Sequence, residues 1–475
     1  MASAADAKKL DVAKFLGGLT FNRYHVLILV ISSLVTFFDG LDFALVSFTL
    51  PYLEEEMNLS EAMLGYVSAA AFAGQMVGSL IGSYIADIVG RRPVILWCTI
   101  LSAVLTFITG FAETPETLIA LRFLGGLSIG GLLAPAWSVN IESMPAGKRA
   151  TAVTIIMLGF SVGSSAAGQV TNFVAPTYGW EGVFFVCGSL TLALAILLQF
   201  TLPESVRWMT AKGKPTAQIV PQLQRFDASI GADQYDGFYL SDERKVTDSE
   251  SPLAKIKELF KGSLAFITPL IWFTYFCSSF AIYMKQAFGL LFLTRLGIER
   301  ELATNLGSIG GIAGAIAGVL LLMLTEKRGP GWIAAAPLVG IPFALGIGWD
   351  LAQGSAFIPV VLIGSVLVGA GHAAVISLTS VYYPSAVRST GGGWASFMAK
   401  FAAVAAPIVG AHYFLSDRTA VLGGYVFTAI CLAGVVIGLM GLAVFAKRLH
   451  AENKAAENAR ANMTEDQTEV AAGAA

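Results

Sequence analysis

The chain has 475 residues, of which 55% are hydrophobic and only 13% are charged, and its mean hydropathy is +0.70. Soluble proteins carry about 25% charged residues, so this composition excludes a soluble globular protein and indicates a polytopic membrane protein. The formal net charge of −2 gives no indication of a nucleic-acid partner. The four cysteines fall in four different apolar segments, so we expect no disulfide framework, no metal and no bound cofactor.

Residues 1–23 are polar, and the apolar run that follows is too long for the core of a signal peptide, so we expect no cleavable signal. A helix needs about 20 apolar residues to cross a bilayer. Apolar runs bounded by charges or turn residues predict twelve such helices, at 24–50, 62–86, 93–111, 117–140, 150–174, 182–202, 264–293, 302–325, 331–349, 356–381, 391–414 and 421–446.

A polar segment at 204–262 divides these spans into two groups of six. The predicted organisation is a cytoplasmic N-terminal segment (1–23), an N-terminal six-helix bundle (24–203), a cytoplasmic linker with room for short surface helices (204–262), a C-terminal six-helix bundle (263–446) and a cytoplasmic tail (447–475). The tail is rich in Ala and Glu without an apolar stripe, and we expect its end to be disordered. With both termini in the cytoplasm, 24 of the 30 Lys and Arg residues lie on the cytoplasmic side, as the positive-inside rule requires.

Two carboxylates, Asp39 and Asp42, lie in the middle of the first predicted span. Each costs about 2.5–3.5 kcal/mol at the centre of a membrane helix, and their spacing of three residues puts both on one face. They must therefore face a polar cavity or a partner. Two adjacent acids do not both ionise freely there, and a carboxyl that exchanges a proton near neutral pH is what proton-coupled transport requires. The alternative is an ion pair that holds the bundle together.

The two halves of the sequence are related by one constant offset of 239 positions. It relates Asp87–Gly90 to Glu326–Gly329, Pro145–Thr151 to Pro384–Thr390, and Gly125 and Gly130 to Gly364 and Gly369. Six spans separate the copies, so both have the same orientation. Parallel repeats of this kind are typical of transporters whose site lies at the midplane between two halves.

Three motifs resemble the major facilitator superfamily. They are Asp87-Ile-Val-Gly90-Arg91-Arg92 between the second and third spans (with Ser83 where the family has Gly), Arg122-Phe-Leu-Gly125 in the fourth, and Pro203-Glu204-Ser205-x-Arg207 after the sixth. The resemblance implies an all-α membrane protein of twelve helices in two bundles. It also implies cytoplasmic ion pairs that hold one conformation closed, for which we predict Asp87, Arg91, Arg92, Glu142, Arg149, Glu204 and Arg207.

Within that superfamily, Asp39-Gly40-Leu41-Asp42 resembles the D-G-x-D motif of the aromatic acid:proton symporters. The segment from Tyr383 to Trp394 is similar to the loop before helix eleven of the same family. The resemblance covers the first six spans densely and spans ten and eleven well. It implies import of benzoate- or hydroxybenzoate-like anions with protons. The family usually has Arg in helix eleven where this chain has Lys400, a point charge instead of a bidentate donor.

The other charged residues within spans are Arg122, Lys285 and Lys400, with His372 in the tenth span. Lys400 is our candidate for the substrate carboxylate, with a permanent ion pair to Asp39 or Asp42 as the alternative. Lys285 is either functional or extends to the membrane interface, and His372 is either functional or merely hydrogen-bonded. With polar stripes on helices five and seven and nearby aromatic residues, the predicted substrate-binding set is Lys400, His372, Arg122, Tyr275, Gln286, Gln169 and Trp394.

The sequence thus predicts a proton-coupled secondary transporter that imports an aromatic carboxylate by alternating access, as a monomer in a bacterial inner membrane. The alternatives are a symporter of another small organic anion or a proton-coupled exporter. Exporters of this fold usually have a Gly-Pro pair in helix five, which Gly159-x-x-x-Gly163-Ser164-Ser165 lacks. A membrane sensor for the same acids is disfavoured because no signalling domain is attached. A membrane enzyme is disfavoured because no nucleophile, metal cluster or cofactor loop is evident.

Overall fold

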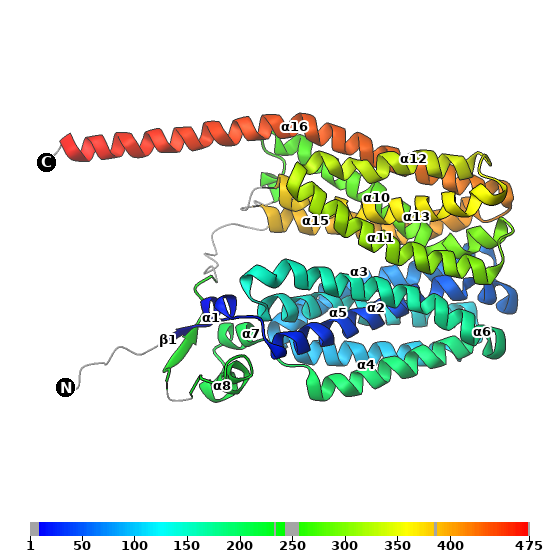
Figure 1. The fold of residues 1–475 in the computed structure, drawn as a ribbon, viewed down its shortest axis with the longest axis horizontal. Helices are drawn as coiled ribbons and strands as arrows, with labels where there is room; N and C mark the ends of the chain where they lie inside the picture. Colours follow the sequence, from blue (N-terminus) through cyan, green and yellow to red (C-terminus); the bar gives the residue numbers. More distant parts are fainter. Residues whose placement is uncertain (1–8, 232–233, 243–255, 384–386, 474–475) are drawn as a thin grey trace.

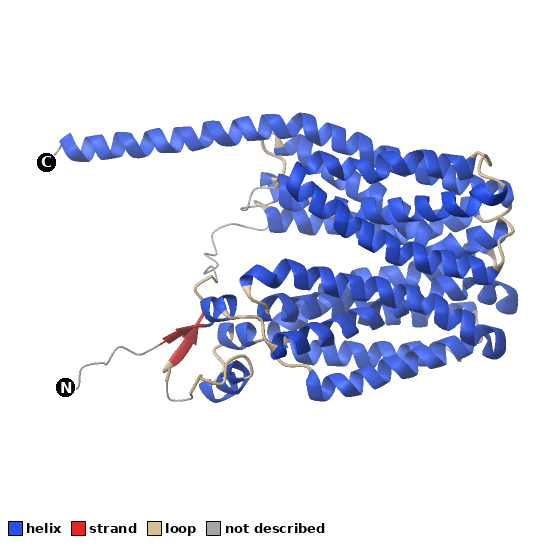
Figure 2. Ribbon diagram, viewed as in Figure 1, coloured by secondary structure: helices blue, strands red, loops and turns tan. Residues whose placement is uncertain are grey.

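The computed structural model describes residues 9–231, 234–242, 256–383 and 387–473. Apart from one small two-stranded sheet, this part of the chain consists of helices and loops (Figure 2). Eleven of its helices are long and apolar enough to cross a membrane. One of them is two helices joined at Gly179, whose φ of 67° and ψ of −178° are not helical. The described chain therefore has twelve membrane spans, and the predicted fold class is confirmed.

The spans form two bundles that lie side by side, with the linker between them in sequence (Figure 1). The N-terminal half consists of α2 (Arg23–Met57), α3 (Glu61–Val89), α4 (Arg91–Thr109), α5 (Pro115–Ser143) and the double helix α6 (Arg149–Thr201), which follows the short η1 (Ala146–Lys148). The C-terminal half consists of α10 (Leu264–Arg295), α11 (Arg300–Arg328), η2 (Pro330–Ala334), α12 (Ala335–Gly348), η3 (Gly354–Ala356), α13 (Phe357–Val375), α14 (Leu378–Tyr382), α15 (Arg388–Phe414) and α16 (Arg418–Gly473).

Local signals in the sequence set the helix boundaries. The Asn22 side chain accepts hydrogen bonds from the N–H groups of Tyr24 and His25 and so caps α2. Thr114 caps α5 ahead of Pro115, whose missing N–H is tolerated in a first helical turn. Gly90 ends α3 at φ 118° and Gly329 ends α11 at φ 99°. These two glycines are separated by the repeat offset and share a backbone conformation that other residues rarely adopt, so the repeat is visible in the backbone.

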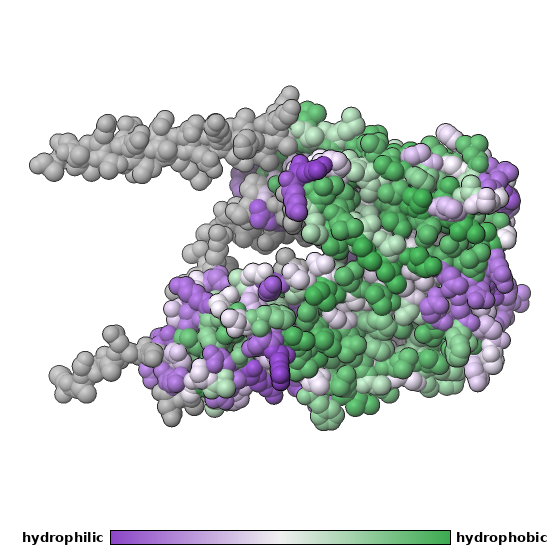
Figure 3. All heavy atoms as spheres, viewed as in Figure 1, coloured by the Kyte–Doolittle hydropathy of each residue, from purple (hydrophilic) through white to green (hydrophobic). Residues whose placement is uncertain are grey.

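Among the described residues, the two halves are in contact from their centre to one end and apart at the other. We call the end that carries the linker the linker end, and the opposite one the distal end. Buried side chains of both halves, Leu50 and Phe288 among them, form one continuous core at the distal end. Toward the linker end the buried side chains form two separate clusters, one in each half. Figure 3 accordingly shows the halves apart at the linker end and in contact at the distal end.

A small cap covers the N-terminal half at the linker end. It contains α1 (Val12–Gly18), α7 (Val206–Ala211) and α8 (Thr216–Gln224), and a parallel sheet of β1 (Lys9–Asp11) with β2 (Gly237–Tyr239). Apolar side chains such as Leu16 and Leu223 join this cap to the N-terminal core. The linker has the short helices for which the sequence left room. That the N-terminal segment pairs with the linker was not predicted, because a three-residue strand leaves no periodic pattern.

The tail differs from the sequence-based expectation. We predicted disorder at its end, whereas α16 continues as a helix from Arg418 to Gly473. Ala and Glu are the commonest residues of this segment, and both have high intrinsic helix propensity. The end of α16 therefore extends from the bundle as a helix (Figure 1). Pro384 of the repeated motif lies outside the described residues.

Candidate functional site

The two acids of α2 lie at the centre of the N-terminal half, where α2 packs closely on α6. Gly40 makes this approach possible, because a Cβ atom there would lie 2.0 Å from the carbonyl oxygen of Phe160. Asp39 is 2% exposed and Asp42 is 5% exposed. Neither carboxylate faces lipid, as the cost of charge in a bilayer led us to expect.

Asp42 is held by partners within its own half. Its carboxylate accepts a short hydrogen bond from the Thr106 hydroxyl, and its Oδ1 lies 3.7 Å from Nη1 of Arg122. Arg122 also donates from Nη2 to the Thr109 hydroxyl at 2.7 Å, and its guanidinium lies 4.9 Å from the ring centre of Phe184. Arg122 is 1% exposed. Asp42 and Arg122 thus form a buried ion pair within one bundle, and Arg122 is directed at Asp42 rather than at the other half.

Asp39 has a different environment. Among the described residues, neither of its oxygens has a hydrogen-bond partner. Its charged neighbours are Asp42 on the same helix and Lys400 on α15 of the other half. Asp39 and Lys400 interact electrostatically across the interface, but they form no salt bridge in this conformation. The fixed partner that Asp42 has is therefore missing at Asp39.

An aromatic layer fills the interface beside Asp39. Tyr283 of α10 interacts electrostatically with Asp39, and its ring lies 5.1 Å from Phe72 and 6.2 Å from Phe43 of the N-terminal half. His372 lies 6.2 Å from the same tyrosine ring, and its Nδ1 is 3.1 Å from the Ser278 hydroxyl. Sequence reasoning did not select Tyr283, although it continues the polar stripe of Tyr275 and Ser279 at a spacing of four residues.

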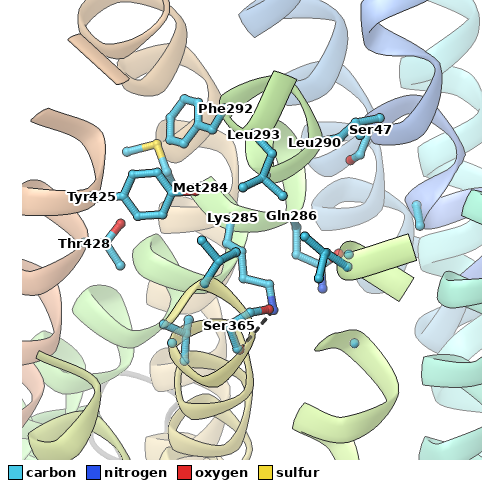
Figure 4. Close-up of a pocket in the computed structure, with 18 of the residues that line it drawn as sticks. Ser47, Met284, Lys285, Gln286, Leu290, Phe292, Leu293, Ser365, Tyr425 and Thr428 are labelled. Atoms are coloured by element: carbon cyan, nitrogen blue, oxygen red, sulfur yellow. Dashed lines mark hydrogen bonds between the residues drawn. The ribbon is translucent and has the colours of Figure 1, made fainter. Parts of the chain in front are cut away.

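A pocket lies between the halves on the distal side of this layer, and we call it the Lys285 pocket (Figure 4). Its lining from the N-terminal half is Ala44, Ser47, Phe48, Ser164 and Ser165, and from the C-terminal half it includes Lys285, Gln286, Leu290, Leu293, Ser365, Tyr425 and Thr428. The Lys285 ammonium donates to the carbonyl oxygen of Ser365 at 3.1 Å. Lys285 therefore faces a pocket between the halves instead of extending to the membrane interface.

The remaining predicted substrate residues lie at scattered places. Tyr275 donates its hydroxyl to the carbonyl oxygen of Ile376 at 2.6 Å within the C-terminal half. Trp394 stacks on Trp272, with ring centres 5.7 Å apart. Gln169 donates to Asn305 at 3.0 Å across the distal interface. Of the predicted set, Gln286 lines the Lys285 pocket. Substrate contact by these residues stays a prediction.

The seven predicted gating residues gather at the linker end, and the contacts described for them stay within the N-terminal half and its linker. Arg91 lies 3.1 Å from Asp87 and 3.5 Å from Glu142. Glu204 accepts the backbone N–H of Arg91 at 3.0 Å. Among further contacts, Arg92 donates to the carbonyl of Leu202, Arg149 donates to the carbonyl of Met144, and Arg207 pairs with Asp242. Because the halves are apart at this end, these contacts stabilise the N-terminal half and do not join it to the C-terminal half.

The electrostatics of this cluster centre on Glu204. Burial raises the pKa of the Glu204 carboxyl above its ordinary value of 4.5, while the backbone N–H groups of Ser205, Arg92 and Arg91 act in the opposite direction. The charged form of the Glu204 carboxyl is therefore unfavourable, even though three backbone N–H groups donate to it.

Ion pairs that cross between the halves lie at the distal end, and the sequence analysis did not select them. Arg295 pairs with Glu54 and lies 3.8 Å from Glu61. Arg300 pairs with Glu55, and its guanidinium lies 4.3 Å from the ring centre of Tyr52. The signal was available, since Glu54-Glu55-Glu56 follows the first predicted span, and Arg295 and Arg300 lie between the predicted spans 264–293 and 302–325.

Comparison with known proteins agrees with this architecture. The family model described as the Major Facilitator Superfamily matches residues 32–407. Similar sequences include the gallate transporter of Pseudomonas putida, with 28% identity over 84% of this chain and 88% of that protein. The 4-hydroxybenzoate transporter PcaK of the same organism has 28% identity with the same coverage. The benzoate transport protein of Acinetobacter baylyi has 26% identity over 85% of this chain and 86% of that protein.

Solved structures with the same fold share little sequence. An inward-facing, unoccupied bacterial homologue of the human lysosomal transporter Spinster superposes with a TM-score of 0.67 and 16% identity, covering 90% of this chain and 98% of that one. The partially occluded inward-open xylose transporter XylE of Escherichia coli gives a TM-score of 0.66 and 18% identity, covering 89% and 99%.

Proposed function

This chain belongs to the Major Facilitator Superfamily, and from that premise we propose that it is a proton-coupled secondary transporter that imports an aromatic carboxylate by alternating access. Three relatives named above carry gallate, 4-hydroxybenzoate or benzoate in their names, and each aligns with most of this chain. They are transporters and not enzymes. The observation that carries the proposal is the buried Asp39 carboxylate, which has no hydrogen-bond partner in the part of the chain that the structure describes and lies within electrostatic range of Lys400 from the other half.

Asp39 and Lys400 supply a simple coupling device. While Asp39 is ionised it attracts the Lys400 ammonium and repels an incoming anion. Two opposite charges about 5 Å apart interact by about 3 kcal/mol at an effective dielectric constant of about 20, a factor of more than 100 in affinity. Protonation of Asp39 removes that competition and leaves Lys400 free for the substrate carboxylate. Proton and anion therefore bind together, which is symport.

Asp42 has a different role in this scheme. Its ion pair with Arg122 and its hydrogen bond from Thr106 hold the carboxylate within the N-terminal half. We therefore assign the coupling proton to Asp39 and do not carry the predicted substrate contact of Arg122 into the proposal.

The conformation supports alternating access. With both termini in the cytoplasm of a bacterial cell, as the distribution of basic residues predicts, the separated linker end faces inward and the closed distal end faces the periplasm. Import then requires the ion pairs of Arg295 and Arg300 to break and the linker end to close. Phe43, Phe72 and Tyr283 would contact the substrate ring beside Asp39, since aromatic pairs favour stacked or edge-on contacts.

The proposal is tested in proteoliposomes with radiolabelled benzoate and 4-hydroxybenzoate. We expect counterflow without any gradient, and accumulation when the interior is made alkaline relative to the exterior. Accumulation that follows a sodium gradient instead would contradict proton coupling. Substrate leaving the vesicles in exchange for entering protons would identify an exporter. Absence of counterflow for every aromatic carboxylate would refute the proposed substrate class.

A further inference from the structure

The Lys285 pocket contains a cation that the coupling scheme does not use. The Lys285 ammonium has three N–H donors, and the described contact is to the carbonyl oxygen of Ser365 at 3.1 Å. The described residues that line the pocket include no aspartate or glutamate. Asp42 shows the contrast, because its buried charge has a cationic partner and a hydroxyl donor. Lys285 is half-buried, and a charge that is partly removed from water without a counter-ion is unfavourable, so the pocket favours binding of an anion.

This pocket is separate from the Asp39–Lys400 pair. The residues that line the pocket do not include Asp39 or Lys400. On α2 the pocket begins at Ala44 and reaches Phe48, which lies beyond Asp39 toward the distal end. The pocket therefore lies between the Asp39–Lys400 pair and the distal ion pairs, on the side where an imported substrate enters.

The walls of the pocket match an aromatic acid. Leu290, Leu293 and Tyr425 supply apolar surface, while Gln286 and Thr428 add neutral polar groups near Lys285 (Figure 4). A pocket with one cation, a few neutral polar groups and otherwise apolar walls suits a ligand with one carboxylate and a hydrophobic ring. Ser47 and Phe48 come from the N-terminal half, so movement of the halves would change the site.

We propose that the Lys285 pocket is a second substrate site, in which the Lys285 ammonium binds the carboxylate of an aromatic monocarboxylate before the ligand moves on to Lys400. The ring lies against Leu290, Leu293 and Tyr425, and the ligand enters when the distal ion pairs open. The inference rests on the proposed function for the class of its ligand. It adds a site to the path and a role for Lys285.

The test is equilibrium dialysis of radiolabelled 4-hydroxybenzoate with the purified full chain, together with the concentration dependence of uptake in proteoliposomes. We expect two molecules bound per wild-type chain and one for Lys285→Met, whose KM should rise about tenfold or more. Lys285→Arg keeps the charge and should retain two. Lys212→Met, at an exposed linker residue, is the matched control and should behave as wild type.

A second variant tests the same site independently, in case Lys285→Met does not fold. Gly289 lines the pocket, and a Cβ atom there would lie 3.7 Å from Cγ of Lys285, an ordinary contact. Gly289→Leu should therefore fold and occupy the site, again leaving one bound molecule. If the wild-type chain transports its substrate but binds one molecule, the second site is refuted and the proposed function stands. The same conclusion follows if both variants bind two molecules. A wild-type chain that neither binds nor transports aromatic monocarboxylates overturns the proposed function as well.

Discussion

Arg295 should control how often the distal end opens. It joins α10 to Glu54 at the end of α2 and to Glu61 at the start of α3. The side chains of Arg295 and Glu54 are about one quarter exposed. A buried charged hydrogen bond contributes about 1.5–3 kcal/mol, and an exposed ion pair contributes about 0.2–1 kcal/mol. The energy of this contact lies between these two ranges. Arg295→Gln should therefore cost the closed distal end about 1–2 kcal/mol, a shift of about 5–30-fold.

Labelling of a cysteine in the Lys285 pocket measures that shift. Ser47→Cys, in a chain whose four native cysteines are replaced, should react with a membrane-impermeant thiol reagent added from the distal side. Adding Arg295→Gln should raise the rate about 5–30-fold. The control is Arg418→Gln, which breaks a 2.8 Å pair with Asp350 within the C-terminal half and should leave the rate unchanged. Equal rates in the two variants would refute the reasoning.

Four further changes test the site and the linker end. Asp39→Asn should retain counterflow but lose accumulation driven by a pH gradient; full accumulation would remove Asp39 from coupling. Lys400→Met should raise the KM about tenfold or more while Lys400→Arg keeps binding, and equal KM values would argue against the carboxylate contact. Arg122→Gln leaves Asp42 buried without its cation and should cost about 3–5 kcal/mol, seen as a large fall in melting temperature in detergent; an unchanged melting temperature would show that the pair is dispensable. Because the pKa of Glu204 is raised, its charge destabilises the folded state above that pKa, and this destabilisation disappears as the pH falls toward 4.5. Glu204→Gln should therefore remove this part of the pH dependence of the melting temperature. Identical pH profiles of melting temperature for the variant and the wild type would contradict this account.

The fold was largely predictable because a bilayer imposes a strong length and composition rule. Each crossing must satisfy its backbone internally and present apolar side chains to lipid, so twelve apolar runs appeared directly in the sequence. The family relationship was predictable from local motifs such as Asp87–Arg92. The tail was predicted less well, since disorder and an isolated Ala- and Glu-rich helix have nearly the same composition.

The site was only partly predictable, and Asp39 and Asp42 show why. Both acids drew attention by their cost in a membrane helix, and their sequence context is almost the same. The structure gives Asp42 a cation and a hydroxyl from α5 and α4, while the Asp39 oxygens have no hydrogen-bond partner among the described residues. Those partners are more than 60 positions away in sequence, so no spacing rule on one helix separates the two roles.

The sequence by itself determined the number of crossings, the relation between the halves and the presence of charges inside the membrane, because these follow from local composition and short repeats. Only the tertiary structure decided which charges face one another. It paired Arg122 with Asp42, placed Lys285 in a pocket whose described lining residues include no acid, and joined the halves through Arg295 and Glu54. Such pairings depend on how two bundles pack, and in this conformation the packing brings the distal ends together and leaves the linker ends apart.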